Sequence, residues 1–122
     1  MRISTGVDLI EIVRIETAVR RHGRRYLERI YTPAELAQAH ELSEYLAGRF
    51  AAKEAVAKAL GTGIGEINWK DIEILGDQQD APTLNLSGAA RARAESLGLS
   101  QWSVSITHGM GQALAFAVAI GS

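Results

Sequence analysis

Residues 43–60 predict a long central helix, because this stretch is rich in alanine, which has the highest helix propensity. The helix is expected to run from about Ser43 to Leu60 and to end at Gly61, since a residue without a Cβ commonly follows the last turn. Glu54 and Lys58 fall one turn apart on one face, flanked by alanines. Small side chains leave shallow grooves where another backbone or a ligand can lie close. The rest of the chain is therefore expected to pack around this helix.

Two interpretations of this helix and its end stay open. A Glu–Lys pair at i,i+4 stabilises any exposed helix by ~0.2–0.5 kcal/mol, so Glu54 and Lys58 can be purely structural. Glycines after a helix are also ordinary stop signals. In the functional interpretation, the glycine-rich run Gly61-Thr62-Gly63 offers backbone N–H groups to a phosphate. Arg49 and Lys53 form a separate polar ridge round the helix.

Length and composition favour one soluble domain covering residues 1–122. The absence of cysteine excludes disulfides, thiolate metal sites and cysteine nucleophiles. No stretch approaches the ~18 apolar residues of a membrane span, and the N-terminus shows no signal-like apolar run, so no membrane association and a cytoplasmic location are expected. The net charge of −1 argues against general nucleic-acid binding.

A predicted strand near the N-terminus, from Ile3 to Ile10, contains an aspartate in an unusual place. Asp8 lies between apolar residues, where burial disfavours a carboxylate unless a cation or hydrogen bonds satisfy it. Gly6 marks a bulge or a close approach of another backbone. Asp8 and Glu54 are thus two carboxylates from separate elements, which is a common way of holding Mg²⁺ together with water and ligand phosphates.

Arginines are concentrated in the segment that follows this strand. Helical spacing of apolar residues predicts a helix that begins near Ile12 and ends at Gly23. Arg14 and Arg21 share one face of it. The cluster is either solvated surface with dipole partners, or a docking patch for an acidic protein, because arginine binds carboxylates through paired hydrogen bonds. Six arginines belong to it: Arg14, Arg20, Arg21, Arg24, Arg25 and Arg29.

The remaining segments predict helices interspersed with short strands. Thr32-Pro33-Ala34-Glu35 is a capping box that begins a helix extending to about Leu42. Short strands are expected over residues 71–75 and 83–86, with a polar turn over 76–82. Ser87 is expected to cap a helix that ends near Leu97.

The C-terminal segment predicts a β-hairpin with a turn at residues 109–111. Trp102, Val104 and Ile106 share one face of its first strand, and the second strand, residues 113–120, has no polar residue. We expect the large side chains of the second strand to face the helices and its alanines to face away, where they must also be covered. A strand buried on both faces in so small a chain indicates a subunit interface.

Several of these motifs, in order along the chain, resemble the holo-acyl-carrier-protein synthase family, the short bacterial-type 4′-phosphopantetheinyl transferases. The resemblance rests on Gly6-Val7-Asp8-Leu9, Arg14-Ile15-Glu16, Gly48-Arg49-Phe50-Ala51-Ala52-Lys53-Glu54-Ala55 through Lys58 to Gly61-Thr62-Gly63, Trp69 with Asp71-Ile72-Glu73, Pro82, and Ser105-Ile106-Thr107-His108. It implies an α+β homotrimer with active sites at the subunit interfaces. The implied reaction is Mg²⁺-dependent transfer of 4′-phosphopantetheine from coenzyme A to a serine of apo acyl carrier protein, releasing adenosine 3′,5′-bisphosphate.

The resemblance also implies residue roles. Asp8 and Glu54 would hold Mg²⁺, Glu54 would accept the serine proton, and Lys58 would contact a phosphate oxygen. The coenzyme A site would be lined by Arg49, Phe50, Gly61, Thr62 and Gly63, with Ser105, Thr107 and His108 supplied by a neighbouring subunit. The acidic carrier protein would bind Arg14, Arg21, Arg24 and Arg25.

One segment departs from the family pattern. The stretch between the Thr32 capping box and Gly48 is short and has no lysine or arginine. A cation for the 3′-phosphate of coenzyme A would then have to come from Arg49, from Lys53 or from a neighbouring subunit.

Two other functions remain as alternatives. A Mg²⁺-dependent phosphohydrolase would use the same two carboxylates without any protein partner. A trimeric scaffold or RNA-binding module would rest on the arginine cluster, but the chain has only seven aromatic residues for base stacking, and several of them are expected in the core.

Overall fold

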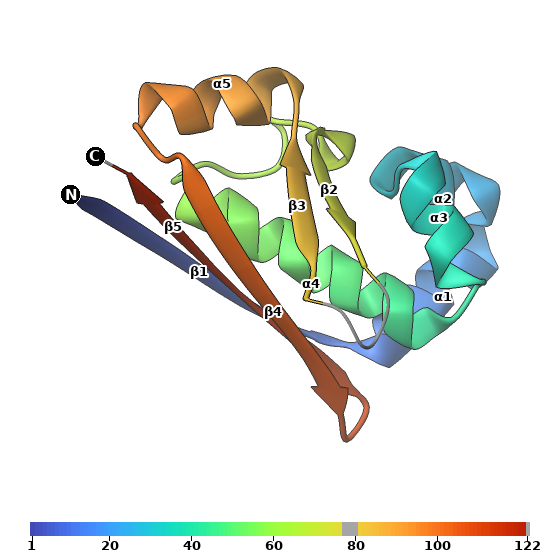
Figure 1. Cartoon of the computed structure of the whole chain (residues 1–122). Coiled ribbons are helices and arrows are strands. Elements are labelled where there is room, and N and C mark those ends of the chain that lie inside the picture. The colour runs from blue at the N-terminus through green and yellow to red at the C-terminus, as the bar shows by residue number, and fades with distance from the viewer. Residues whose placement is uncertain (77–80, 122) are drawn as a thin grey trace.

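The computed structural model describes residues 1–76 and 81–121, and its core element is a three-stranded antiparallel sheet (Figure 1). Strands β1 (Arg2–Glu11), β4 (Gln101–Gly109) and β5 (Gln112–Gly121) form it in the order β1-β5-β4, so the last strand of the chain lies in the middle. A separate two-stranded sheet pairs β2 (Ile72–Leu75) with β3 (Thr83–Leu86). The expected polar turn over 76–82 lies largely outside the described residues.

Helix α4 (Ser43–Ala59) packs against β1 and β5 on one side and against β2 on another, as the expected central helix. The predicted start is confirmed, and Gly61 with φ +71° takes the left-handed conformation that ends it. Burial of this helix includes Arg49 and Lys53, although the sequence indicates a polar ridge there. This helix is therefore surrounded by protein on several sides.

The orientation of β5 is the reverse of the sequence-based expectation. Its alanines face α4 and are fully buried, while its large side chains lie on the outer face of the sheet, where Leu114 and Phe116 are exposed. The reason is the spacing between the two elements: alanines on both α4 and β5 let the helix lie close to the sheet, and larger side chains would hold it away. The four inward alanines are Ala113, Ala115, Ala117 and Ala119.

Gly6 is the point of closest approach between β1 and α4. A Cβ built at Gly6 would lie 1.8 Å from the carbonyl oxygen of Ala55, which is far inside van der Waals contact. Ser4, two residues earlier, donates a hydrogen bond to the carbonyl of Ala59. The expected close approach at Gly6 is thus confirmed, and it brings the Asp8 strand directly onto the helix that carries Glu54.

Three helices gather at one end of α4, and a fourth lies at the other end (Figure 1). Helix α1 (Ile12–His22) ends at Gly23 as expected, but α2 (Arg24–Ile30), which follows at once, was not predicted. Helix α3 (Pro33–Ala39) has the expected capping box yet ends before Leu42, because His40 and Glu41 take positive φ angles. Helix α5 (Gly88–Ser96) follows β3, and a short 3₁₀ helix, η1 (Trp69–Asp71), precedes β2.

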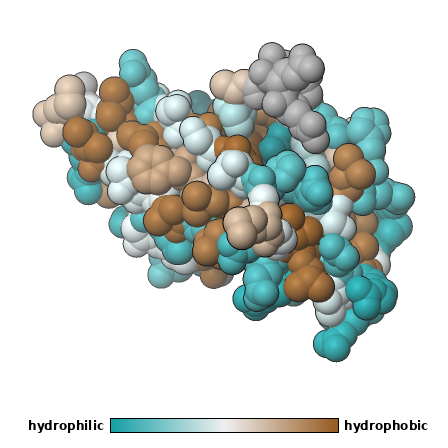
Figure 2. All heavy atoms as spheres, turned by 90° about the horizontal axis from the view of Figure 1, so that it is seen from below, coloured by the Kyte–Doolittle hydropathy of each residue, from teal (hydrophilic) through white to brown (hydrophobic). Residues whose placement is uncertain are grey.

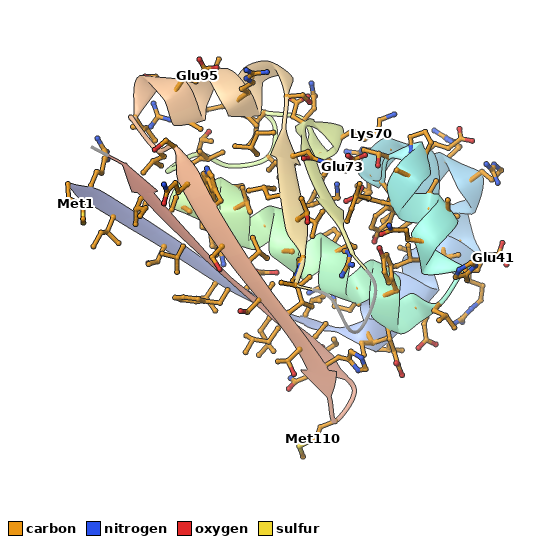
Figure 3. All side chains as sticks on the ribbon, in the orientation of Figure 1. Met1, Glu41, Lys70, Glu73, Glu95 and Met110 are labelled. Carbon is orange, nitrogen blue, oxygen red and sulfur yellow. The ribbon has the colours of Figure 1, made fainter. Side chains whose placement is uncertain are left out.

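The β4–β5 hairpin turns at Met110, whose side chain projects from the tip into solvent (Figure 3). The side of β4 that faces α4 carries Trp102, Val104 and Ile106, as expected, and the outer face carries Ser103, Ser105 and Thr107.

Among the described residues, no helix is both long and apolar enough to cross a bilayer.

Candidate active site

Asp8 and Lys58 form an ion pair where β1 meets α4. Asp8 points from β1 toward the helix, and Lys58 Nζ lies 3.2 Å from Asp8 Oδ1. The same ammonium donates a hydrogen bond of 2.9 Å to the backbone carbonyl of Val7. The aspartate that is unusual in an apolar strand is therefore satisfied by a cation. The contribution of the Val7 carbonyl has no signature in the sequence, because any residue can supply it.

Glu54 lies one turn before Lys58 and is half-buried. Burial raises the pKa of its carboxyl group, the negative charge of Asp8 raises it further, and the positive charge of Lys58 opposes both. In the part of the chain that the structure describes, the ion-pair partner of Lys58 is Asp8 and not Glu54. The structural i,i+4 pair that the sequence left open is thus not the arrangement observed.

The pair formed by Asp8 and Glu54 suits a divalent cation. The negative charge of Asp8 disfavours the ionised form of Glu54, and a cation between the two carboxylates would relieve this repulsion, because Mg²⁺ prefers oxygen ligands of this kind. No cluster of three or more acidic or histidine side chains that could hold a metal occurs within residues 1–76 and 81–121. A cation here would therefore have two protein carboxylates and would leave its other positions to water and substrate oxygens.

The glycine loop after α4 lies at the Lys58 end of the helix. Gly61 and Gly63 are exposed, and the space around the missing Cβ of Gly63 is open. The Thr62 hydroxyl group donates to the Glu66 carboxylate, which ties the loop to itself. The loop thus presents exposed backbone just after Lys58, and its role in approaching a phosphate stays a prediction.

Arg49 and Phe50 are engaged within the fold. The Arg49 guanidinium donates to the carbonyl groups of Ile74 and Gly76 and lies 3.9 Å over the Tyr45 ring. Phe50 packs on Trp69 with their ring centroids 4.7 Å apart. A role for either in lining a coenzyme site stays a prediction, since both have structural partners.

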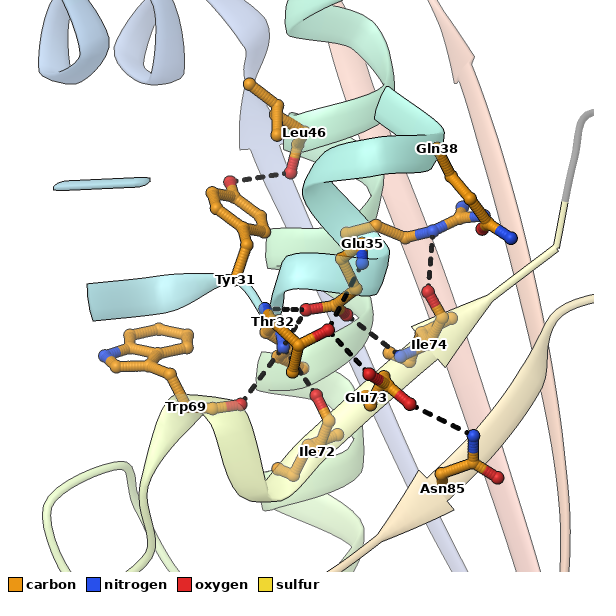
Figure 4. A network of polar contacts seen from close by, with 12 residues as sticks. Tyr31, Thr32, Glu35, Gln38, Leu46, Trp69, Ile72, Glu73, Ile74 and Asn85 are labelled. Atoms are coloured by element: carbon orange, nitrogen blue, oxygen red, sulfur yellow. Dashed lines mark hydrogen bonds and ion pairs between the residues drawn. The ribbon is translucent and has the colours of Figure 1, made fainter. Parts of the chain in front are cut away.

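The suggestion that Lys53 supplies a cation for the 3′-phosphate of coenzyme A is wrong. Its ammonium group is fully buried, and its three donors are used by Glu35, the Trp69 carbonyl and the Ile72 carbonyl (Figure 4). The buried partner Glu35 was predicted only as part of the capping box. Its second role, as the counter-ion of Lys53, depends on how α3 packs on α4.

Three residues predicted to line the coenzyme A site do not lie near Asp8, Glu54 and Lys58 within one chain. They are Ser105, Thr107 and His108. Ser105 and Thr107 lie on the outer face of the sheet, whereas Asp8 faces α4. His108 Nδ1 lies 3.7 Å from Glu44 Oε2, in the first turn of α4. Glu44 and Glu54 are separated by about 15 Å along the helix at 1.5 Å per residue. Within one chain, these residues therefore do not join Asp8, Glu54 and Lys58, and their part in the site stays a prediction.

The arginines predicted to bind a partner are exposed on α1 and α2. Arg14 and Arg21 lie two turns apart on α1, which begins directly after β1, and Arg24 and Arg25 begin α2. Arg24 forms a solvent-exposed ion pair with Glu28, and such pairs contribute little to stability. The cationic surface is therefore close in sequence to Asp8 and available to a second protein.

Comparison with known proteins identifies the family of the chain. Residues 4–118 match the family model of the 4′-phosphopantetheinyl transferase superfamily, and the chain belongs to that superfamily. It is 48% identical over 124 residues to the holo-[acyl-carrier-protein] synthase of Herpetosiphon aurantiacus, an alignment that covers 96% of this chain and 98% of that protein. It is 45% identical over 121 residues to the synthase of Natranaerobius thermophilus, with 97% of each chain covered.

Solved structures give the same result for the fold. The crystal structure of Helicobacter pylori holo-[acyl-carrier-protein] synthase in complex with coenzyme A aligns with a TM-score of 0.86 at 37% identity, covering 95% of this chain and 99% of that one. The synthase from Neisseria meningitidis aligns with a TM-score of 0.85 at 38% identity, covering 96% and 97%. The predicted family and the predicted α+β fold are confirmed.

Proposed function

We propose that this protein transfers 4′-phosphopantetheine from coenzyme A to a serine hydroxyl group of apo acyl carrier protein, giving the holo carrier and adenosine 3′,5′-bisphosphate. The observation that carries this proposal is the convergence of Asp8, Glu54 and Lys58 where β1 crosses α4, in a chain of the 4′-phosphopantetheinyl transferase superfamily. The similarity to a synthase solved with coenzyme A supports the choice of donor.

Glu54 is the residue that would accept the proton of the serine. In the reaction a bond forms between the serine oxygen and the β-phosphorus of coenzyme A, and the bond from that phosphorus to the oxygen bridging to the nucleotide breaks. The serine proton passes to a base, and the adenosine 3′,5′-bisphosphate departs. The raised pKa of Glu54 brings it toward the operating pH, where a general base is most effective.

Lys58 would stabilise the charge that develops on the transferred group. Its ammonium group is half-exposed and held by Asp8 and the Val7 carbonyl, so it is oriented before substrate arrives. Phosphoryl transfer depends mainly on such positioning and charge stabilisation. Asp8 and Glu54 would hold Mg²⁺, which when bound neutralises charge on the pyrophosphate oxygens.

A homotrimer with sites at the subunit interfaces would complete the coenzyme A site. Apolar side chains on the outer face of the sheet, visible among polar ones when the molecule is viewed from below (Figure 2), support burial by another copy. This outer face carries Ile3, Val7, Leu9, Leu114 and Phe116, with Ser103, Ser105 and Thr107 along β4. The same assembly would bring Ser105, Thr107 and His108 of one subunit toward Glu54 of its neighbour.

The carrier protein would dock on the α1 and α2 arginines. Its acidic surface matches Arg14, Arg21, Arg24 and Arg25 in charge, and arginine binds carboxylates with two parallel hydrogen bonds. This surface begins at the end of β1, so a partner bound to it lies next to the strand that carries Asp8. A cytoplasmic location accords with such a partner.

Intact-mass spectrometry of an apo acyl carrier protein tests the function. After incubation with the protein, coenzyme A and Mg²⁺, the carrier should gain one phosphopantetheine, and the gain should disappear with EDTA and with Glu54→Gln. Cleavage of coenzyme A with no gain on several carrier proteins would instead favour the phosphohydrolase. If the Asp8→Asn/Glu54→Gln variant modified the carrier protein as well as the wild type does, the proposed site would be refuted.

A further inference from the structure

The buried ion pair between Glu35 and Lys53 joins three segments of the chain (Figure 4). Lys53 Nζ lies 2.8 Å from Glu35 Oε1, and both side chains are fully buried. The other Glu35 oxygen, Oε2, accepts a 2.9 Å hydrogen bond from the backbone N–H of Ile74. Glu35 Oε1 also accepts from the N–H of Thr32 at 2.8 Å. Helix α3, helix α4 and strand β2 are therefore tied to one pair of charges.

The side chains of Glu35 and Lys53 have no solvent access, and every donor and acceptor of the two has a partner. Lys53 donates to Glu35 and to the carbonyl groups of Trp69 and Ile72, which uses all three of its donors. No buried side-chain nitrogen or oxygen lacks a partner in the described part of the chain. Groups so placed cannot touch a substrate. Because removing two charges from water offsets most of their attraction, net stability is also a poor explanation for the pair.

The geometry of α4 indicates what the Glu35–Lys53 ion pair controls. Lys53 and Glu54 are adjacent, so their side chains leave the helix about 100° apart. Lys53 is held by β2, and Arg49, one turn earlier on the same side, is held by the carbonyl groups of Ile74 and Gly76. Glu54 emerges on the side that faces β1 and Asp8. The helix is therefore held by polar contacts on one side and presents Glu54 on the other.

We propose that the Glu35–Lys53 ion pair sets the rotation of α4 about its axis and thereby positions Glu54 against Asp8. Glu35 and Lys53 are positioning residues that act through the helix and contact neither substrate nor metal. With side chains, a helix has a radius of 5–6 Å, so a rotation of roughly 20° moves a carboxylate at its surface by about 2 Å. Displacements of about 1 Å are enough to lower a catalytic rate by about 100-fold.

Strand β1 makes directional contacts with α4 only in the last turn of the helix, through the Lys58–Asp8 ion pair and the hydrogen bond from Ser4 to the Ala59 carbonyl group. Before that turn, the surfaces that meet are alanines of α4 and Gly6 with its flanking strand, which are small and smooth. Such a surface permits close approach but offers few interlocking side chains. The charged contacts of Arg49 and Lys53 add a directional constraint in the middle of the helix, because hydrogen bonds weaken steeply when their angle changes. The requirement for a directional contact explains a buried charge in an otherwise apolar core.

Two variants test the proposal. Lys53→Met/Glu35→Leu removes both charges without leaving either one unpaired, and Glu35→Asp keeps both charges but shortens the acidic side chain by one methylene. In crystal structures of either variant, we expect the Glu54 carboxylate to move by about 1 Å or more relative to Asp8. The affinity of the free protein for Mn²⁺, measured by electron paramagnetic resonance, should fall about tenfold for each, since two ligands no longer converge.

A kinetic readout separates positioning from simple packing. The proposal relies on the proposed function for the role of Glu54, and we expect kcat to fall by ~10- to 100-fold at temperatures well below the unfolding transition, with the Mg²⁺ concentration for half activity raised. The KM for carrier protein should be unchanged, because the exposed arginines proposed to bind it belong to α1 and α2 and take no part in the Glu35–Lys53 network. Asn85→Ala is the matched control: it removes a hydrogen bond to Glu73 in the same network without touching α4.

Three outcomes overturn the proposal. One is a Glu54 carboxylate that keeps its wild-type position in the Glu35→Asp crystal structure, whatever the activity. A second is a variant with lowered thermal stability but wild-type kcat and Mn²⁺ affinity, since the pair would then be structural only. A third is an equal loss of kcat in Asn85→Ala. If the wild-type protein does not modify a carrier at all, the proposed function fails, while the crystallographic comparison still decides the positioning role. If the double variant does not fold, Glu35→Asp alone provides the same measurements.

Discussion

Glu54 is subject to opposing electrostatic influences, and their balance links activity to stability. Burial and the charge of Asp8 raise the pKa of Glu54, while Lys58 opposes the increase. A raised pKa means that folding favours the protonated carboxyl group. The stability associated with this group is therefore present at low pH and is lost as the pH rises through the pKa of the folded state. At neutral pH, without a bound cation, the carboxylate of Glu54 reduces the stability of the fold.

Glu54→Gln should accordingly abolish activity without destabilising the protein. We expect transfer to fall by ~10²–10⁴-fold, which is the usual contribution of a general base. Without divalent cation at neutral pH, the melting temperature should be at or above that of the wild type, and the difference should shrink as the pH is lowered. Calorimetry across pH and a carrier-modification assay measure the two effects.

Glu95→Gln is the matched control, because Glu95 is exposed on α5 and forms a solvent-exposed ion pair with Arg91. It should change neither the activity nor the pH dependence of the melting temperature. A Glu54→Gln protein that is clearly less stable than the wild type at neutral pH would contradict the assigned electrostatic environment.

At the scale of elements, the decisive contact is between β1 and α4. The backbone of the strand reaches that of the helix only because residue 6 has no side chain. This contact brings Asp8 to Lys58, and alanines on the facing surfaces of α4 and β5 keep the helix close to the sheet. Close approach between the elements is thus the structural basis of the site.

Gly6→Ala should separate the strand from the helix. The added Cβ would meet the Ala55 carbonyl oxygen at 1.8 Å, and since this neighbour is backbone, the elements must move apart. We expect a loss of about 1–3 kcal/mol of unfolding free energy or more, measured by chemical denaturation, together with weaker metal binding. Gly109→Ala is the control, because its Cβ would meet nothing within 4 Å, and an equal loss in both variants would refute this explanation.

Helix α1 supplies a second element-scale prediction. Arg14→Glu should raise the KM for carrier protein by about tenfold or more, since a charge that attracts an acidic partner becomes repulsive. The KM for coenzyme A should stay the same, because α1 carries no residue assigned to that site. The effect should weaken at high salt, where exposed charges are screened.

Steady-state kinetics with each substrate varied in turn provides the measurement. Arg91→Glu on α5 is the control for a general change of net charge, since Arg91 is exposed and remote in sequence from the arginine cluster. Equal increases in both KM values for Arg14→Glu would indicate that α1 is not the docking surface.

At the scale of the whole molecule, the sheet has one face covered by α4 and one open face. Leu9 is 56% exposed and Phe116 is 43% exposed on the open face, an unusual position for large apolar side chains on neighbouring strands. The residues predicted to bind coenzyme A are also divided between this face and the region near Glu54. Both observations favour an assembly in which neighbouring copies complete one another.

Leu114→Asp should break that assembly while leaving the single chain folded. Leu114 points away from the core, so the new charge costs little within one chain, but it would be buried at an interface. We expect analytical ultracentrifugation to show a monomer with unchanged circular dichroism and greatly reduced transfer activity. Met110→Asp, at the tip of the hairpin, should keep the wild-type mass. A wild-type protein that is already monomeric and active would exclude the trimer.

Sequence alone determined the features that depend on neighbouring residues along the chain. The alanine-rich run defined α4 and its glycine end, the alternating residues defined the C-terminal hairpin, and the Thr32 capping box defined the start of α3. Propensity, periodicity and capping act over a few residues, so they can be read without the fold. The motifs around Asp8 and Glu54 were specific enough to indicate the family for the same reason.

Tertiary structure decided which side chains meet. Alanines rather than large residues of β5 face α4, Lys58 pairs with Asp8 rather than with Glu54, and Lys53 is buried with Glu35 rather than free for phosphate. Each outcome depends on the distance and rotation between elements far apart in the chain. Those quantities are set by packing of complementary surfaces and by the need to pair every buried charge, and neither condition appears in a local pattern of residues.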